Sequence, residues 1–143
     1  MISKILVFLQ FFIIFLMILP LGEKTSYLEI GMGITLFGLL VGALALKSNT
    51  LGNFNIRPDI KESCTLVTDG IYGYIRHPMY LSVLLMMLGI AVVYYSNYEL
   101  ILWTLLVLVL LVKLLYEESL WECHSSEYRA YRERTKRLIP FIF

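Results

Sequence analysis

The sequence predicts an all-α polytopic membrane protein with about four transmembrane helices and a cytoplasmic C-terminal helical segment. Three observations predict this fold class. The 143 residues are 59% hydrophobic and 16% charged, which lies outside the range of ordinary soluble domains. The chain contains four long apolar runs. Basic residues gather in only two of the segments that separate or follow these runs.

The four apolar runs cover residues 5–19, 27–46, 79–95 and about 100–115. A spanning helix needs roughly 20 predominantly apolar residues, so the second run fits best. The other runs are short, but they suffice if the polar side chains that flank them snorkel to the membrane surface. The first run follows Lys4 as in a signal peptide, but "LPLGEKTS" after it lacks a small-x-small cleavage pattern. We therefore expect a retained helix there.

The second run contains three glycines in "GMGITLFG", namely Gly31, Gly33 and Gly38. A dinucleotide-binding fingerprint has similar glycines, but it needs a strand before it and a helix that opens at it. Here the glycines lie inside an apolar helix. We expect them to allow close packing against a neighbouring helix.

Basic residues predict the orientation of the chain. Lys47, Arg57, Lys61 and Arg76 lie between the second and third runs, whereas only Lys24 follows the first run and no basic residue follows the third. The segment after the fourth run contains Arg129, Arg132, Arg134, Lys136 and Arg137. The positive-inside rule then places both termini and the polar segments in the cytoplasm. Cys64 and Cys123 fall on this reducing side, where we expect structural thiols and no metal site.

The chain is expected to form a single membrane domain over residues 1–143. Residues 1–46 form two N-terminal spans, 47–78 a cytoplasmic loop, 79–116 a helical hairpin that turns at "YSNYE", and 117–143 a cytoplasmic segment. In the last segment, polar and aromatic residues recur at steps of three and four, so the fourth helix should continue beyond the membrane. These residues are Glu117, Leu120, Trp121, His124, Tyr128 and Tyr131. Pro140 and the following "FIF" predict an apolar tail that folds back against the bundle or the membrane surface.

The stretch "GYIRHPMY", residues 73–80, carries the chemistry at the start of the third run. Pro78 suits the first turn of a helix, because its missing N–H would be unpaired there anyway. His77 then lies in the cap region. The partial positive charge of a helix N-terminus, together with the forked donors of Arg76, suits a carboxylate or a phosphate. An arginine that snorkels to lipid phosphates is the alternative, and local sequence alone does not decide between the two.

The short hairpin brings Arg76 and His77 level with Glu117 and Glu118 at the end of the fourth run. Lys113 precedes Glu117 by one turn, so an ordinary i,i+4 ion pair is an alternative use of that glutamate. A pocket with both signs of charge suits a zwitterionic sulfonium such as S-adenosylmethionine, whose adenine also needs an aromatic face. The available aromatic residues are Tyr74, Tyr80, Trp121 and Tyr128.

The stretches "LVTDGIYGYIRHPMYLS" and "EESLWECHSSEYRAYRERTKRLIPFI" resemble the two C-terminal signatures of the isoprenylcysteine carboxyl methyltransferase family, which is related to the small phospholipid methyltransferases. The resemblance covers residues 66–142. It implies S-adenosylmethionine as methyl donor, covered by residues 117–143 on the cytoplasmic side, and a lipophilic acceptor that enters from the bilayer. Departures from the pattern are Ile71, Gly73, Ser82 and the pair His124-Ser125.

The resemblance also assigns residues to the site by motif. Arg134 would face the acceptor carboxylate, and Glu117 would orient the cofactor. The cofactor site would be lined by Tyr72, Arg76, His77, Pro78, Tyr80, Glu117, Tyr128 and Tyr131, with Glu118 sharing the assignment of Glu117.

The expected function is methylation of an isoprenylcysteine-like carboxylate by positioning and desolvation of the nucleophile. One alternative is a phospholipid N-methyltransferase, in which His124 or a glutamate takes the proton of the amine. Others are an NADPH-dependent lipid or sterol reductase, and a non-catalytic membrane adaptor whose residues 129–137 bind anionic headgroups. The expected partners are the lipophilic acceptor and membrane lipids, without nucleic acid. The sequence leaves the acceptor and the oligomeric state open.

Overall fold

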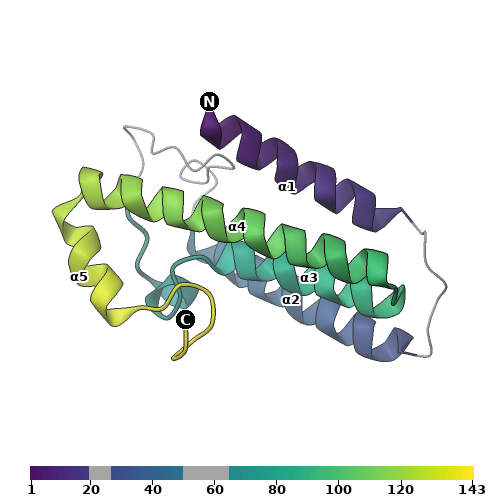
Figure 1. Cartoon of the computed structure of the whole chain (residues 1–143). Coiled ribbons are helices and arrows are strands. Elements are labelled where there is room, and N and C mark those ends of the chain that lie inside the picture. The colour runs from purple at the N-terminus through teal and green to yellow at the C-terminus, as the bar shows by residue number, and fades with distance from the viewer. Residues whose placement is uncertain (20–26, 50–64) are drawn as a thin grey trace.

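The computed structural model describes residues 1–19, 27–49 and 65–143, and this part of the chain is all-α, as predicted (Figure 1). It contains five α-helices and one 3-10 helix. They are α1 (Ile2–Ile18), α2 (Leu28–Ser48), η1 (Gly70–Gly73), α3 (Pro78–Val93), α4 (Asn97–His124) and α5 (Ser126–Arg134). The four long helices lie along one another, and α5 turns back from the end of α4 (Figure 1).

Two of these helices, α2 with 21 residues and α4 with 28, are long and apolar enough to cross a membrane. The apolar helices α1 and α3 have 17 and 16 residues. At 1.5 Å per residue each is about 25 Å long, a few ångströms less than the ~30 Å hydrocarbon core of a bilayer. The four predicted apolar runs thus each become one helix, and the number that spans the membrane stays a prediction.

The core lies between α1, α3 and α4. Leu106, Leu110 and Leu114 of α4 are fully buried and belong to one apolar cluster with Met17 of α1 and Met87 of α3. The outer faces of α1 and α2 expose leucine, isoleucine and phenylalanine side chains. Because such faces cost free energy in water, they suit a lipid environment.

Close packing of α2 on α3 depends on glycines, and the prediction holds for two of the three. A Cβ added to Gly31 would lie 2.6 Å from the carbonyl oxygen of Gly89, and one added to Gly38 would lie 2.8 Å from the backbone nitrogen of Met86. Gly33 has nothing within 4 Å of such a Cβ, so the prediction is wrong for that residue. Ser82 of α3 adds a polar contact, since its hydroxyl donates to the carbonyl oxygen of Gly38 at 2.8 Å.

Gly31→Ala should lower the melting temperature of the protein, whereas Gly33→Ala should leave it unchanged or raise it. The new methyl group at Gly31 meets backbone on α3, which moves only if the two helices separate. At Gly33 the added methyl group meets nothing, and alanine favours a helix over glycine by about 1 kcal/mol. Thermal unfolding of both variants in one detergent measures the difference. Equal melting temperatures would contradict the close packing of α2 and α3.

The two termini lie at the end of the bundle where α3 begins and α4 ends (Figure 1). This arrangement agrees with termini on one side of a membrane, and the cytoplasmic assignment stays a prediction. Four residues used to predict orientation and thiol environment lie outside the described residues: Lys24, Arg57, Lys61 and Cys64. Cys123 is exposed on α4.

Cysteines introduced at Ser26, which lies outside the described residues, and at Ser125 should react with a membrane-impermeant reagent from opposite sides. Three predicted spans separate these positions, so the chain should change side between them. The experiment requires a background in which Cys64 and Cys123 are replaced. Labelling of both positions from the same side of sealed vesicles would contradict the four-span topology.

The fourth helix continues beyond its apolar part, as predicted, and ends at His124. Extended backbone at Ser125 (φ −135°, ψ 125°) then interrupts the helix. The face that the sequence predicts from Glu117 to Tyr131 is therefore not one straight helical face. Instead α5 folds back, and this brings Tyr128 against Trp121.

Candidate active site

The segment before α3 pairs with the segment after α5. The backbone N–H of Arg76 donates to the carbonyl oxygen of Lys136 at 2.7 Å, and that of His77 donates to Arg137 at 3.0 Å. The N–H of Lys136 donates in return to Tyr74 at 3.1 Å, which completes a short parallel bridge. Pro78 occupies the first turn of α3, as predicted. The C-terminal segment is thus held against the start of α3.

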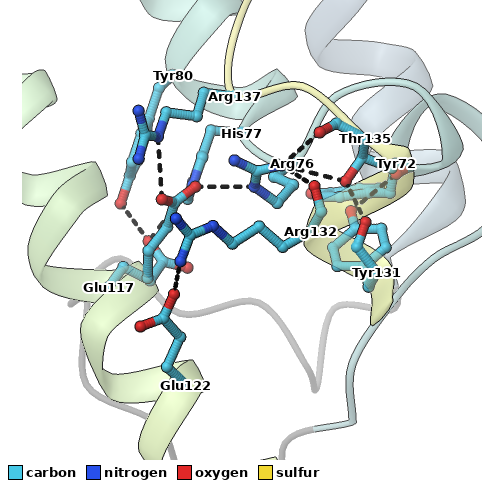
Figure 2. A network of polar contacts seen from close by, with 11 residues as sticks. Tyr72, Arg76, His77, Tyr80, Glu117, Glu122, Tyr131, Arg132, Thr135 and Arg137 are labelled. Carbon is cyan, nitrogen blue, oxygen red and sulfur yellow. Dashed lines mark hydrogen bonds and ion pairs between the residues drawn. The ribbon is translucent and has the colours of Figure 1, made fainter. Parts of the chain in front are cut away.

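The side chain of Glu118 joins these two segments to the end of α4. Its Oε1 accepts from Arg76 Nε at 2.8 Å and lies 3.4 Å from His77 Nε2, while its Oε2 accepts from Arg137 Nε at 3.0 Å. The side chains of Glu118 and Arg76 are only 5% and 6% exposed. Because the acid is buried among side-chain nitrogens of three residues, it brings Arg76, His77 and Arg137 together (Figure 2).

Arg76 also binds the end of α5. Its Nη1 donates to the carbonyl oxygens of Thr135 at 2.5 Å and Arg132 at 3.1 Å. Among the described residues, Nη2 of Arg76 has no acceptor. The forked guanidinium therefore ties α4 to the end of α5 through Nε and Nη1.

Glu117 differs from Glu118 in exposure and in partners. Its Oε2 accepts from the Tyr80 hydroxyl at 2.7 Å and lies 4.0 Å from His77 Nδ1, and its side chain is 29% exposed. The predicted meeting of Arg76 and His77 with the acidic pair is confirmed, but the partner of Arg76 is Glu118. Glu117 is the member of the pair that remains open to a ligand.

Lys113 is buried and forms no ion pair with Glu117, so the alternative of an i,i+4 pair is wrong. Its Nζ donates to Gln10 Oε1 of α1 at 2.7 Å and lies 5.0 Å from the ring centre of Tyr80. The residue is 2% exposed. The helix α1 thereby contacts the side chains next to the site.

Aromatic residues of α4, α5 and η1 form an aromatic wall beside the acidic pair Glu117 and Glu118. Trp121 and Tyr128 stack with centroids 6.1 Å apart, Tyr131 meets the edge of Tyr128 at 6.0 Å, and the Tyr131 hydroxyl donates to the carbonyl oxygen of Tyr72 at 2.7 Å. Burial raises the pKa of Tyr128 and of Tyr131, so both phenols stay neutral near neutral pH. Tyr74 is 65% exposed.

The hydroxyl of Tyr128 is buried without a hydrogen-bond partner among the described residues. A buried polar atom of this kind costs free energy unless another molecule pairs with it. The open carboxylate of Glu117, the spare nitrogen of Arg76 and the aromatic wall adjoin the same acidic pair. This donor set fits a ligand that combines a carboxylate, a cation and an aromatic ring, as S-adenosylmethionine does.

Arg134 lies on the exposed side of α5, with its guanidinium carbon 6.0 Å from the ring centre of Tyr131. Its neighbour Arg132 instead forms an exposed ion pair with Glu122. No contact in the described residues joins Arg134 to Glu117 or Glu118. Its assignment to the acceptor stays a prediction.

Sequence reasoning missed four residues of this region: Gln10, Thr135, Arg137 and Leu138. Arg137 was predicted only as one of the basic residues that set the orientation of the chain, although it reaches Glu118. Leu138 is 6% exposed and packs into the core, while Phe141 and Ile142 are 85% and 76% exposed. Leu138 thus contacts the bundle, whereas the predicted apolar tail from Pro140 onward lies at the surface, and its contact with the membrane stays a prediction.

Comparison with known families gives one match. The sequence profile of the phospholipid methyltransferase family matches residues 28–124. The isoprenylcysteine carboxyl methyltransferases form a related family within the same clan. No curated protein matches the chain. The matched residues run from α2 to the end of α4, so they include Arg76, His77 and the acidic pair but not α1 or α5.

Proposed function

The chain belongs to the phospholipid methyltransferase family, and we propose from this premise that it methylates the amine nitrogen of a phospholipid headgroup. It is a membrane methyltransferase that uses S-adenosylmethionine and acts on a lipid acceptor. The family match over residues 28–124 carries the choice of acceptor, because phospholipid methylation is the function of this family. The isoprenylcysteine carboxylate expected from the sequence has less support.

The bound cofactor supplies an electrophilic methyl group on a sulfonium. The lone pair of the acceptor nitrogen forms the new C–N bond as the S–C bond breaks, and the electron pair of that bond stays on sulfur as a neutral thioether. A primary or secondary amine must also lose a proton, either before or after the transfer. The protein therefore needs to bind and orient two ligands and to take up one proton.

Arg76, His77 and the aromatic wall are proposed to hold the cofactor. Nη2 of Arg76 is available for a carboxylate, and the unpartnered hydroxyl of Tyr128 is available for a polar group beside the stacked Trp121. The ring of His77 stacks on Tyr80 at 5.3 Å, which fixes both side chains beside Glu117. Glu118 positions Arg76 and His77 through the contacts described above. Tyr131 joins this wall to η1 through the hydrogen bond that its hydroxyl donates to the carbonyl oxygen of Tyr72.

Glu117 is proposed to take the proton of the amine. Its carboxylate is the more exposed of the acidic pair, and it already accepts one hydrogen bond from Tyr80. His124, the other base considered, is exposed at the end of α4 and touches only the edge of Trp121 in the described residues. Glu117 is therefore better placed than His124.

An amine acceptor changes the expectation for Arg134. In a carboxyl methyltransferase this residue would hold the acceptor carboxylate, but an amine headgroup such as ethanolamine has no carboxylate to hold. Replacement of Arg134 should then have little effect on N-methylation. It should strongly impair methylation of a carboxylate.

Incubation of the purified protein with S-adenosylmethionine labelled in its methyl group tests the proposal. Phosphatidylethanolamine and an isoprenylcysteine lipid are offered in separate reactions, in one neutral detergent. We expect label in phosphatidylethanolamine that survives mild base, because an N-methyl bond is stable there and a methyl ester is hydrolysed. Glu117→Gln should abolish the labelling.

Base-labile label in the isoprenylcysteine lipid, lost in Arg134→Ala, would support the carboxyl methyltransferase alternative instead. Binding of S-adenosylmethionine without label in either lipid would overturn the choice of acceptor and leave the cofactor assignment in place. Glu122→Gln serves as the control for Glu117→Gln, since it removes an acidic charge from the exposed side of the same helix.

A further inference from the structure

Lys113 is a buried cation that the proposed methyl transfer does not use. It is 2% exposed in α4, and its hydrogen-bond partner is the neutral amide oxygen of Gln10. An ammonium group has three N–H donors. Within the described residues one donor reaches Gln10, the Tyr80 ring lies 5.0 Å away, and no carboxylate forms a direct ion pair with the ammonium group, although the charge of Glu117 acts on it from the next turn.

A buried ammonium group without a direct ion pair is expensive, and ionisable residues inside membrane helices usually mark a functional site. Among the described residues only one of its donors has a hydrogen-bond acceptor, so the other two can bind an anion. The neutral amide of Gln10 is a weak substitute for one, because a hydrogen bond between two charged groups is stronger than one to a neutral oxygen.

We propose that Lys113 binds the phosphodiester of the lipid acceptor, so that the phosphate replaces Gln10 as the acceptor of its hydrogen bonds. This inference rests on the proposed function and adds a phosphate site to it. It also gives α1, which lies outside the family match, a place at the acceptor site.

The spacing along α4 supports this assignment. Lys113 and Glu117 are four residues apart, so they lie on one face of the helix about 6 Å apart along its axis. In an ethanolamine headgroup, two carbons separate the phosphate oxygen from the nitrogen. A headgroup along this face can place its phosphate at Lys113 and its amine at Glu117.

The order of the two residues also matches the order of groups in a lipid. Lys113 follows the apolar part of α4 and precedes the acidic pair and the polar end of the helix. In a phospholipid the phosphate likewise lies between the acyl chains and the amine. Lys113 therefore lies toward the apolar part of α4, and Glu117 lies toward its polar end.

Equilibrium binding separates this role from catalysis. Short-chain phosphatidylethanolamine and a long-chain alkylamine, which has no phosphate, are titrated in neutral detergent while tryptophan fluorescence is recorded. Lys113→Met should raise the Kd for phosphatidylethanolamine about tenfold, the effect of losing one charged hydrogen bond. The Kd for the alkylamine should stay within about twofold of the wild-type value, because the alkylamine has no phosphate for Lys113 to bind. Lys47→Met, at an exposed lysine of α2, should change neither value.

Gln10→Leu distinguishes a phosphate site from a structural hydrogen bond. The substitution removes the competing acceptor and keeps Lys113, so phosphatidylethanolamine should bind as well as to the wild type or more tightly. Inorganic phosphate is added as a competitor to separate the lipid from a free anion. Millimolar phosphate should not displace the lipid.

Several results would overturn the inference. For Lys113→Met they are an unchanged Kd for phosphatidylethanolamine in the folded variant, or an equal rise in the Kd for phosphatidylethanolamine and for the alkylamine. For Gln10→Leu the contrary result is weaker binding of phosphatidylethanolamine. For the wild type the contrary results are displacement of bound phosphatidylethanolamine by inorganic phosphate, or no binding of phosphatidylethanolamine at all. Wild-type protein that binds phosphatidylethanolamine through Lys113 but never methylates it would contradict the proposed function and leave the phosphate site standing.

Discussion

Glu118→Ala should abolish methyl transfer and lower the stability of the protein strongly. The substitution removes the carboxylate that accepts from Arg76 and Arg137 and lies beside His77. Arg76 is 6% exposed, and a buried cation that loses its partner costs about 3–5 kcal/mol. Thermal unfolding and methyl transfer to the lipid acceptor measure the two effects.

The C-terminal segment should respond to the same change. Glu118 holds Arg137 directly and, through Arg76, the carbonyl groups of Arg132 and Thr135. In Glu118→Ala the chain after α5 should therefore become sensitive to limited proteolysis.

Glu122→Ala is the matched control, because Glu122 lies one turn later on α4 and its ion pair with Arg132 is exposed. Such a pair contributes about 0–1 kcal/mol. Similar losses of stability in the two variants would contradict the central role of Glu118.

The helices could be predicted from the sequence because each long apolar run specifies one helix. Pro78 and the "YSNYE" turn also fixed the start of α3 and the α3–α4 connection close to their positions in the structure. Which residues of one helix contact the neighbouring helix was harder to predict. Hydropathy shows that Gly31 and Gly33 lie in one helix, but only the position of α3 decides which of them meets backbone.

The site could be predicted in its residue types and only partly in its pairings. The hairpin argument brings Arg76 and His77 to the acidic pair, yet two adjacent glutamates on a helix point in directions about 100° apart. The sequence does not say which of them faces the bundle. Glu118 faces inward and Glu117 faces the open side.

Pairings of residues far apart in the chain left no local signal. Arg137 reaches Glu118 only because the segment after α5 pairs with the segment before α3, and Gln10 meets Lys113 across 103 residues. In the sequence the basic residues after the fourth apolar run predict only the orientation of the chain or, in the adaptor alternative, a surface for anionic headgroups. In the structure Arg132 and Arg137 have different carboxylate partners, and Arg134 lies against Tyr131.

Arg76→Lys should weaken the binding of S-adenosylmethionine by about tenfold or more, although it preserves the charge. Arg76 uses Nε for Glu118 and Nη1 for the carbonyl oxygens of Thr135 and Arg132. A lysine has a single nitrogen, so it cannot bind the acid, hold the end of α5 and reach a ligand carboxylate at once. Loss of a charged hydrogen bond costs about 1.5–3 kcal/mol, which is roughly tenfold or more in affinity.

Arg137→Lys is the control that separates the fork from the charge. Arg137 donates through Nε alone to a single oxygen of Glu118, and its side chain is 28% exposed. A lysine nitrogen can replace this one contact, so cofactor affinity should change little. Calorimetric titration of both variants with S-adenosylmethionine, after thermal unfolding has confirmed that each is folded, gives the comparison. Unchanged affinity in Arg76→Lys would mean that Arg76 only joins α4 to the end of α5, and the cofactor carboxylate would then need another partner.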